Sequence, residues 1–72
     1  MKPIDWLTPR EAQIARMLGE GKAPQVIAAE LGISRRTVSN MLYAVADKVG
    51  ALTIPHLAVM VATGEIDLSQ SL

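Results

Sequence analysis

The sequence contains no cysteine and no phenylalanine, and its only aromatic residues are Trp6 and Tyr43. Without cysteine, the chain has neither a disulfide framework nor a thiolate metal site. Without phenylalanine, its core must be built from Ile, Val, Leu, Met and Ala, and the number of alanines favours helices over strands. No apolar run is long enough to span a bilayer, since residues 54–63 have about half the necessary length. With no signal peptide either, we expect a cytoplasmic protein with no membrane partner.

The chain also lacks net charge, because seven Lys and Arg residues balance seven Asp and Glu residues. A neutral protein is expected to bind nucleic acid weakly outside its specific sites, since that binding depends on an excess of basic residues. The charges are unevenly placed, however, and between residues 32 and 46 only Arg35 and Arg36 are charged. Half of the residues are hydrophobic, a high share for so small a chain, which predicts a partner or a dimer.

A chain of 72 residues has room for one domain, and it contains no internal repeat and no linker. We therefore expect residues 1–72 to form a single unit with a core over about 7–63. Ser and Gln in the tail, residues 65–72, predict poor order there.

Local signals place the first helix after Thr8, because Thr8 and Glu11 have the spacing of a capping box. Gly19 and Gly21 are expected to end this helix. Thr53 is the expected cap of a fourth helix, over residues 54–63.

The middle of the chain predicts two helices joined by a tight turn. The first covers residues 24–31 and is followed by Gly32, where we expect a positive φ, and by Ile33 as a hydrophobic plug. Ser34 caps the next helix, which covers about 34–49. This order is typical of the helix-turn-helix motif. We therefore expect an all-α, four-helix helix-turn-helix domain, similar to a winged helix but without the wing.

Several short motifs, in order, resemble the LuxR/GerE-type helix-turn-helix domain: Leu7-Thr8-Pro9-Arg10-Glu11, Ile27-Ala28, Leu31-Gly32-Ile33-Ser34, Arg36-Thr37-Val38 and Lys48-Val49-Gly50. The resemblance covers roughly residues 7–62. It implies four helices, DNA binding through the third helix and dimerisation through the fourth. Region 4 of sigma factors has a similar motif and stays open as an alternative.

The chain departs from that pattern mainly by trading charge for neutral or apolar side chains. Ser39 stands where a Lys is common, and Met41 where a His is common. Farther along the third helix, Ala44 and Asp47 replace residues that are usually basic. These departures weaken the expectation of tight DNA binding.

Five residues of the third helix are candidates for contact with DNA. Arg35 and Arg36 can bind phosphate or a guanine edge. A positive charge at the start of a helix is unfavourable with the macrodipole, and this unfavourable placement favours a functional role for the two residues. The resemblance places base-reading residues at about Ser39, Asn40 and Tyr43. Asn can pair with adenine, and Ser can contact either kind of base. The plain alternative is a solvated outer face.

Three further residues are candidates for donating a hydrogen bond to a DNA phosphate: Thr37, Lys48 and Lys22. The resemblance implies this role for Thr37 and Lys48, whereas Lys22 is proposed from its place in the first loop. Ordinary surface positions are the alternative for each. Asp47 lies one turn beyond Tyr43, and its carboxylate is expected to repel phosphate.

The fourth helix is apolar nearly all round, so we expect it to pack on two sides. A dimer or partner interface is expected at four residues, Ile54, Leu57, Met60 and Val61, with the alternative that they complete the core. His56 is the only histidine, and with no cysteine or second histidine it predicts no metal site.

No arrangement of residues predicts catalysis, a metal or a cofactor, so we expect no enzyme. The favoured hypothesis is a DNA-binding transcription regulator that acts as a homodimer on double-stranded DNA. The alternative is an anti-activator or adaptor on the same scaffold, which docks on another transcription regulator or on RNA polymerase. The neutral and apolar substitutions in the third helix are the reason for keeping this alternative.

Overall fold

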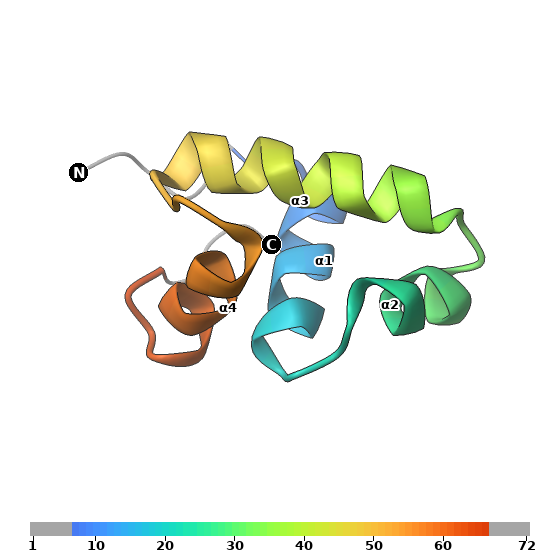
Figure 1. Cartoon of the computed structure of the whole chain (residues 1–72), viewed down its shortest axis with the longest axis horizontal. Coiled ribbons are helices and arrows are strands. Elements are labelled where there is room, and N and C mark those ends of the chain that lie inside the picture. The colour runs from blue at the N-terminus through green and yellow to red at the C-terminus, as the bar shows by residue number, and fades with distance from the viewer. Residues whose placement is uncertain (1–6, 67–72) are drawn as a thin grey trace.

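The computed structural model describes residues 7–66, which form four helices and, within that range, no strand (Figure 1). The helices are α1 (Pro9–Gly19), α2 (Pro24–Leu31), α3 (Arg35–Val49) and α4 (Ile54–Ala62). The prediction of an all-α helix-turn-helix domain is confirmed. Poor order is predicted for the tail, residues 65–72, of which residues 67–72 lie outside the described residues.

Short polar side chains begin three of the four helices, as the sequence predicted. Thr8 and Glu11 form a complete capping box: Glu11 N–H donates to Thr8 Oγ1 at 3.1 Å, and Thr8 N–H donates to Glu11 Oε1 at 2.9 Å. Ser34 Oγ accepts from Thr37 N–H, and Thr53 Oγ1 accepts from His56 N–H, each at 3.0 Å. Each such cap stabilises its helix by about 1 kcal/mol.

Glycines end α2 and α3 with a left-handed residue, with φ of 69° at Gly32 and 81° at Gly50. Gly19 is the last residue of α1, with Glu20 as the cap residue, and it also has a role in packing. A Cβ at position 19 would overlap Val61 Cγ1 of α4, so this glycine allows close approach of two helices. The predicted end of α1 at Gly19 is confirmed, and the packing against Val61 is a further reason for a glycine at this position.

The core lies where α1 meets the other three helices, and α2 packs mainly on α3. Six large side chains are fully buried: Ile14, Ile27, Val38, Leu42, Val45 and Leu57. Ile66 is also buried in this cluster, so packing reaches three residues beyond the predicted limit of 63. α3 lies along one long edge of the domain, with α2 and α4 on the same side of it (Figure 1). Among residues 7–66, no helix covers the opposite side of α3.

Candidate nucleic-acid interface

The α2–α3 unit is held at its turn by backbone geometry and one apolar side chain. Gly32 and Ile33 both donate their N–H groups to the carbonyl oxygen of Ala28, which closes the end of α2. Ile33 is half-buried and packs against the core. Ser34 then starts α3 with its side-chain cap. The turn thus fixes the direction in which α3 leaves α2.

Period and burial divide α3 into two faces. The inner face carries Val38, Leu42 and Val45, none of which is exposed. Opposite it lie four exposed residues at spacings of four, three and four, which we call the outer stripe: Arg36, Asn40, Tyr43 and Asp47. Tyr43 is 62% exposed, unusual for an aromatic side chain. The outer stripe is a straight, accessible line along the helix.

The N-terminal end of α3 presents two exposed guanidinium groups. Arg35 and Arg36 form no ion pair with any carboxylate of residues 7–66. Their charge stands at the end of the helix where the macrodipole disfavours it, so they do not serve to stabilise α3. Thr37 is exposed, but its hydroxyl lies 2.9 Å from Ser34 Oγ and already takes part in the cap. Ser39 is half-buried beside the outer stripe.

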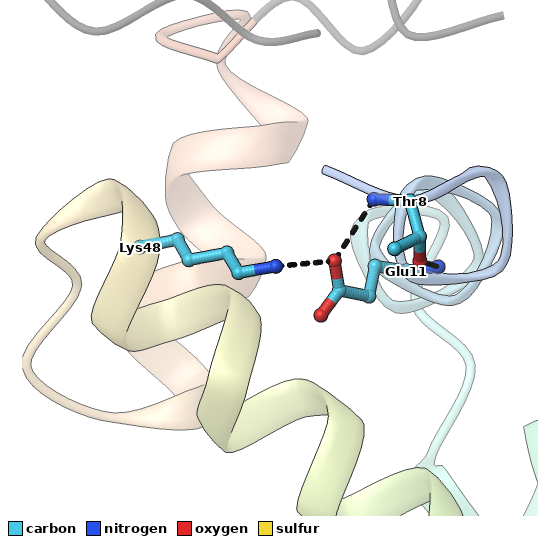
Figure 2. Close-up of polar contacts among 3 residues, drawn as sticks. All are labelled: Thr8, Glu11 and Lys48. Atoms are coloured by element: carbon cyan, nitrogen blue, oxygen red, sulfur yellow. Dashed lines mark hydrogen bonds and ion pairs between the residues drawn. The ribbon is translucent and has the colours of Figure 1, made fainter. Parts of the chain in front are cut away.

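Lys48 does not belong to this face. Its Nζ donates to Glu11 Oε1 at 2.7 Å, and this hydrogen bond connects the C-terminal end of α3 with the start of α1 (Figure 2). The same carboxylate oxygen accepts from Thr8 N–H, so one oxygen joins the α1 cap to α3. This geometry revises the expectation of a phosphate contact at Lys48, because its charge is used inside the domain.

Glu11 is the one charged residue of the range 7–66 that is buried, with 8% of the residue exposed. Burial raises the pKa of Glu11, but the hydrogen bonds from Lys48 and Thr8, with the charge of Lys48, outweigh burial and leave the pKa below its ordinary value. Glu11 is therefore ionised at neutral pH and holds Lys48 in place.

Lys22 is also placed away from the outer stripe. It lies in the α1–α2 loop, which Figure 1 shows at the edge of the domain opposite α3. Its Nζ donates to Glu30 Oε1 at 2.9 Å and lies 3.8 Å from Glu20 Oε1. The hydrogen bond to Glu30 raises the pKa of Lys22. The structure therefore separates Lys22 from the other predicted DNA contacts.

Only part of the predicted interface on α4 is accessible. Leu57 and Met60 are buried in the domain's own core, and Ile54 and Val61 are partly buried. Four other apolar residues are exposed here, Leu52 in the turn before α4 and Pro55, Val59 and Ala62 on the helix, and we call them the α4 outer stripe. The sequence did not single out this side, because a helix that is apolar all round does not indicate which side faces its neighbours.

Leu52 is the most exposed of these residues, at 88%, and Val59 follows at 57%. Residues 51–64 contain no Asp, Glu, Lys or Arg, so the stripe has no charged residue within its own segment. A hydrogen bond from Leu52 N–H to His56 Nδ1, at 3.0 Å, holds the turn that leads into α4. The only histidine therefore has a structural partner.

Residues 7–66 contain no group of three or more His, Asp or Glu side chains placed to hold a metal ion. Within the same range, no single helix has the length and apolar character needed to cross a membrane.

A model of the GerE family, described as bacterial regulatory proteins of the luxR family, matches residues 5–61. The chain belongs to the luxR family. Its membership identifies it as a domain of the DNA-binding helix-turn-helix regulators, a family of regulatory proteins rather than of enzymes. No curated protein and no solved structure matches this luxR-family chain. The motif resemblance found in the sequence is thus confirmed at the level of the family.

Proposed function

We propose that this luxR-family domain regulates transcription by placing α3 in the major groove of double-stranded DNA. The observation that carries the proposal is the outer stripe, which is exposed along its whole length. Arg36 at its start and the neighbouring Arg35 form no ion pair with a carboxylate of residues 7–66. A helix that projects from its domain in this way fits the width of the major groove.

Within this proposal the residues have different tasks. Arg36 contacts a guanine edge or a phosphate, and Arg35 contacts phosphate. Asn40 reads adenine, and Tyr43 and Ser39 contact neighbouring edges. Thr37 has a smaller part, because its hydroxyl is already engaged with Ser34. Lys22 and Lys48 are left out, since both bind carboxylates elsewhere in the domain.

We propose further that the regulator binds as a homodimer in the cytoplasm, through the fourth helix. Its exposed α4 outer stripe supports this, because a contiguous apolar side on a small domain marks an interaction surface. Val59 and Leu52 are the central contacts, in place of the buried Leu57 and Met60. Two copies related by a two-fold axis bind a site with matching symmetry.

The test is binding of a fluorescent random-sequence duplex at several low salt concentrations. The wild type is expected to bind with a dissociation constant of roughly 10⁻⁴ to 10⁻⁶ M. Arg36→Ala should weaken binding and reduce the salt slope by about 0.9 if it removes one phosphate contact. Lys22→Ala is the matched control, since it removes the same charge at the opposite edge of the domain, and it should bind as the wild type does.

Two results would count against this function. If the wild type shows no binding at protein concentrations up to roughly 10⁻⁴ M at low salt, the DNA-reading proposal fails. If Arg36→Ala and Lys22→Ala weaken binding equally, the effect comes from net charge and not from α3.

A second candidate function is docking on another transcription regulator or on RNA polymerase. Two features of the outer stripe favour it: the exposed aromatic ring of Tyr43, and the carboxylate of Asp47, which repels phosphate and has no ion-pair partner among residues 7–66. Three results together would support this second function. The folded protein does not bind DNA, purified RNA polymerase retains it, and the Tyr43→Ala variant is no longer retained.

A further inference from the structure

The outer stripe of α3 carries opposite charges at its two ends. Arg36 lies in the first turn of the helix and Asp47 in the last, so their Cα atoms are about 16 Å apart along the axis. Neither has an ion-pair partner within residues 7–66. Lys48, the cation next to Asp47 in the sequence, is instead bound to Glu11. The stripe therefore ends in one uncompensated charge of each sign.

Neither charge stabilises the helix that bears it. A cation at the N-terminus and an anion at the C-terminus are both unfavourable with the macrodipole. Both side chains are exposed, so neither fills the core. A surface that keeps two unfavourable charges in line is explained by a partner that carries the opposite pattern.

A second copy of this chain carries that pattern. When two outer stripes face each other antiparallel, Arg36 of each copy lies opposite Asp47 of the other, and Asn40 of each lies opposite Tyr43. All four pairs are complementary, since the amide of Asn40 can bind the tyrosine hydroxyl. The arrangement is reciprocal, as an interface on a two-fold axis requires. Ser39 and Ala44, which flank the stripe, are small enough to let the helices approach.

We propose that the outer stripe of α3 binds the outer stripe of a second copy in antiparallel orientation. The long edge on which α3 lies leaves room for this contact, because α2 and α4 are on its other side (Figure 1). The net charge of zero removes the long-range repulsion that opposes self-association. One face of one helix is smaller than a standard interface, so the association is weak, with a dissociation constant of roughly hundreds of micromolar.

This contact uses the side chains that the proposed function assigns to DNA. Self-association and DNA binding through α3 are therefore mutually exclusive, and a high local concentration of the protein masks the reading face. That consequence for regulation rests on the proposed function, whereas the self-association does not. The α4 outer stripe is a separate surface and is free to act in either state.

Charge reversal tests the pairing. Arg36→Glu gives a stripe with two negative ends, and Asp47→Arg gives a stripe with two positive ends. Each variant repels its own copies but complements the other variant. Both substitutions place the charge that the macrodipole favours, so neither is expected to unfold α3. The measurement is sedimentation velocity of the full chain over a range of concentrations and salt, for the wild type, each variant and an equimolar mixture.

The wild type should show association that salt weakens, and each variant alone should associate about tenfold more weakly. The mixture should regain association at least equal to that of the wild type. The proposal is overturned if the variants and the wild type sediment alike. It is also overturned if the wild type shows no association that depends on these charges, and association of the mixture would not rescue it in that case.

A further arm separates this inference from the proposed function. Random-sequence duplex added to the associated wild type should release the α3 contact if α3 also binds DNA. Charge-dependent self-association that persists unchanged with DNA would refute the DNA-reading role and leave the self-association standing. Conversely, DNA binding with no charge-dependent association would refute only the inference.

Discussion

Replacing Lys48 by methionine removes the cation that neutralises the most buried charge among residues 7–66. Lys48→Met keeps the aliphatic stem and its packing but deletes the ammonium group that lies 2.7 Å from Glu11 Oε1. The Glu11 side chain is 10% exposed and that of Lys48 is 32% exposed, so the pair lies between a surface pair and a buried one. We expect a loss of about 2 kcal/mol in the free energy of unfolding, between about 1 for exposed pairs and 3–5 for buried ones.

For a domain of this size, that loss lowers the melting temperature by roughly 10 °C, measurable by far-ultraviolet circular dichroism. Lys22→Met is the matched control, because it removes the same charge from a pair whose two members are more exposed. It should change the melting temperature little. If Lys48→Met is no more harmful than Lys22→Met, the buried ion pair does not stabilise the fold as described.

The pH dependence provides an independent check, because the pKa of Glu11 is lowered in the folded protein. A carboxyl with a lowered pKa stabilises the fold fully above its ordinary value of 4.5, and this contribution is lost as pH falls through the folded pKa. The difference between wild type and Lys48→Met should therefore be largest at neutral pH and shrink below about pH 4.5. In a Glu11→Gln background, Lys48→Met should cost less at neutral pH. A deficit that is independent of both pH and Glu11 would refute the reasoning.

Two other predictions test local packing and capping. Gly19→Ala should lower the free energy of unfolding in urea by about 1–2 kcal/mol, despite the better helix propensity of alanine, because the new Cβ overlaps Val61. Adding Val61→Ala to this variant should recover part of the loss. A stabilising Gly19→Ala would show that α1 and α4 separate easily. His56→Leu should lower the free energy of unfolding by about 1 kcal/mol and speed hydrogen exchange at the Leu52 amide, because the acceptor at Nδ1 is lost. His56→Gln should change the stability and the exchange rate less. Equal exchange rates in the two variants would refute the role of that hydrogen bond.

Much of the architecture followed from signals a few residues long. Thr8, Ser34 and Thr53 cap helices because a short side-chain oxygen reaches the free N–H groups of the first turn, which is a local event. Gly32 and Gly50 end helices because a left-handed residue is costly for other side chains. The inner face of α3, with Val38, Leu42 and Val45, has the spacing that helical periodicity requires. These features depend on neighbours along the chain, so a single sequence is enough to predict them.

In the candidate site too, some features depend on neighbours along the chain and others only on the folded domain. Arg36, Asn40 and Tyr43 share the outer face of α3 because their spacing places them there, and burial on the opposite face agrees. Lys48 looked equally suited to bind phosphate, yet Glu11 lies 37 residues earlier in the chain and the two meet only in the folded domain. Lys22 is likewise bound by Glu30 at the far end of α2.

The sequence by itself determined where the helices begin and end, the class of fold and the family, because caps, glycine turns and periodicity act over one or two turns of helix. The tertiary structure alone decided which cations are free and which apolar residues are exposed. Gly19 ends α1 as predicted, but its close approach to Val61 follows from the packing of α1 against α4. Leu57 entered the core while Val59 stayed outside, because contacts between distant segments decide which side of an all-apolar helix is buried.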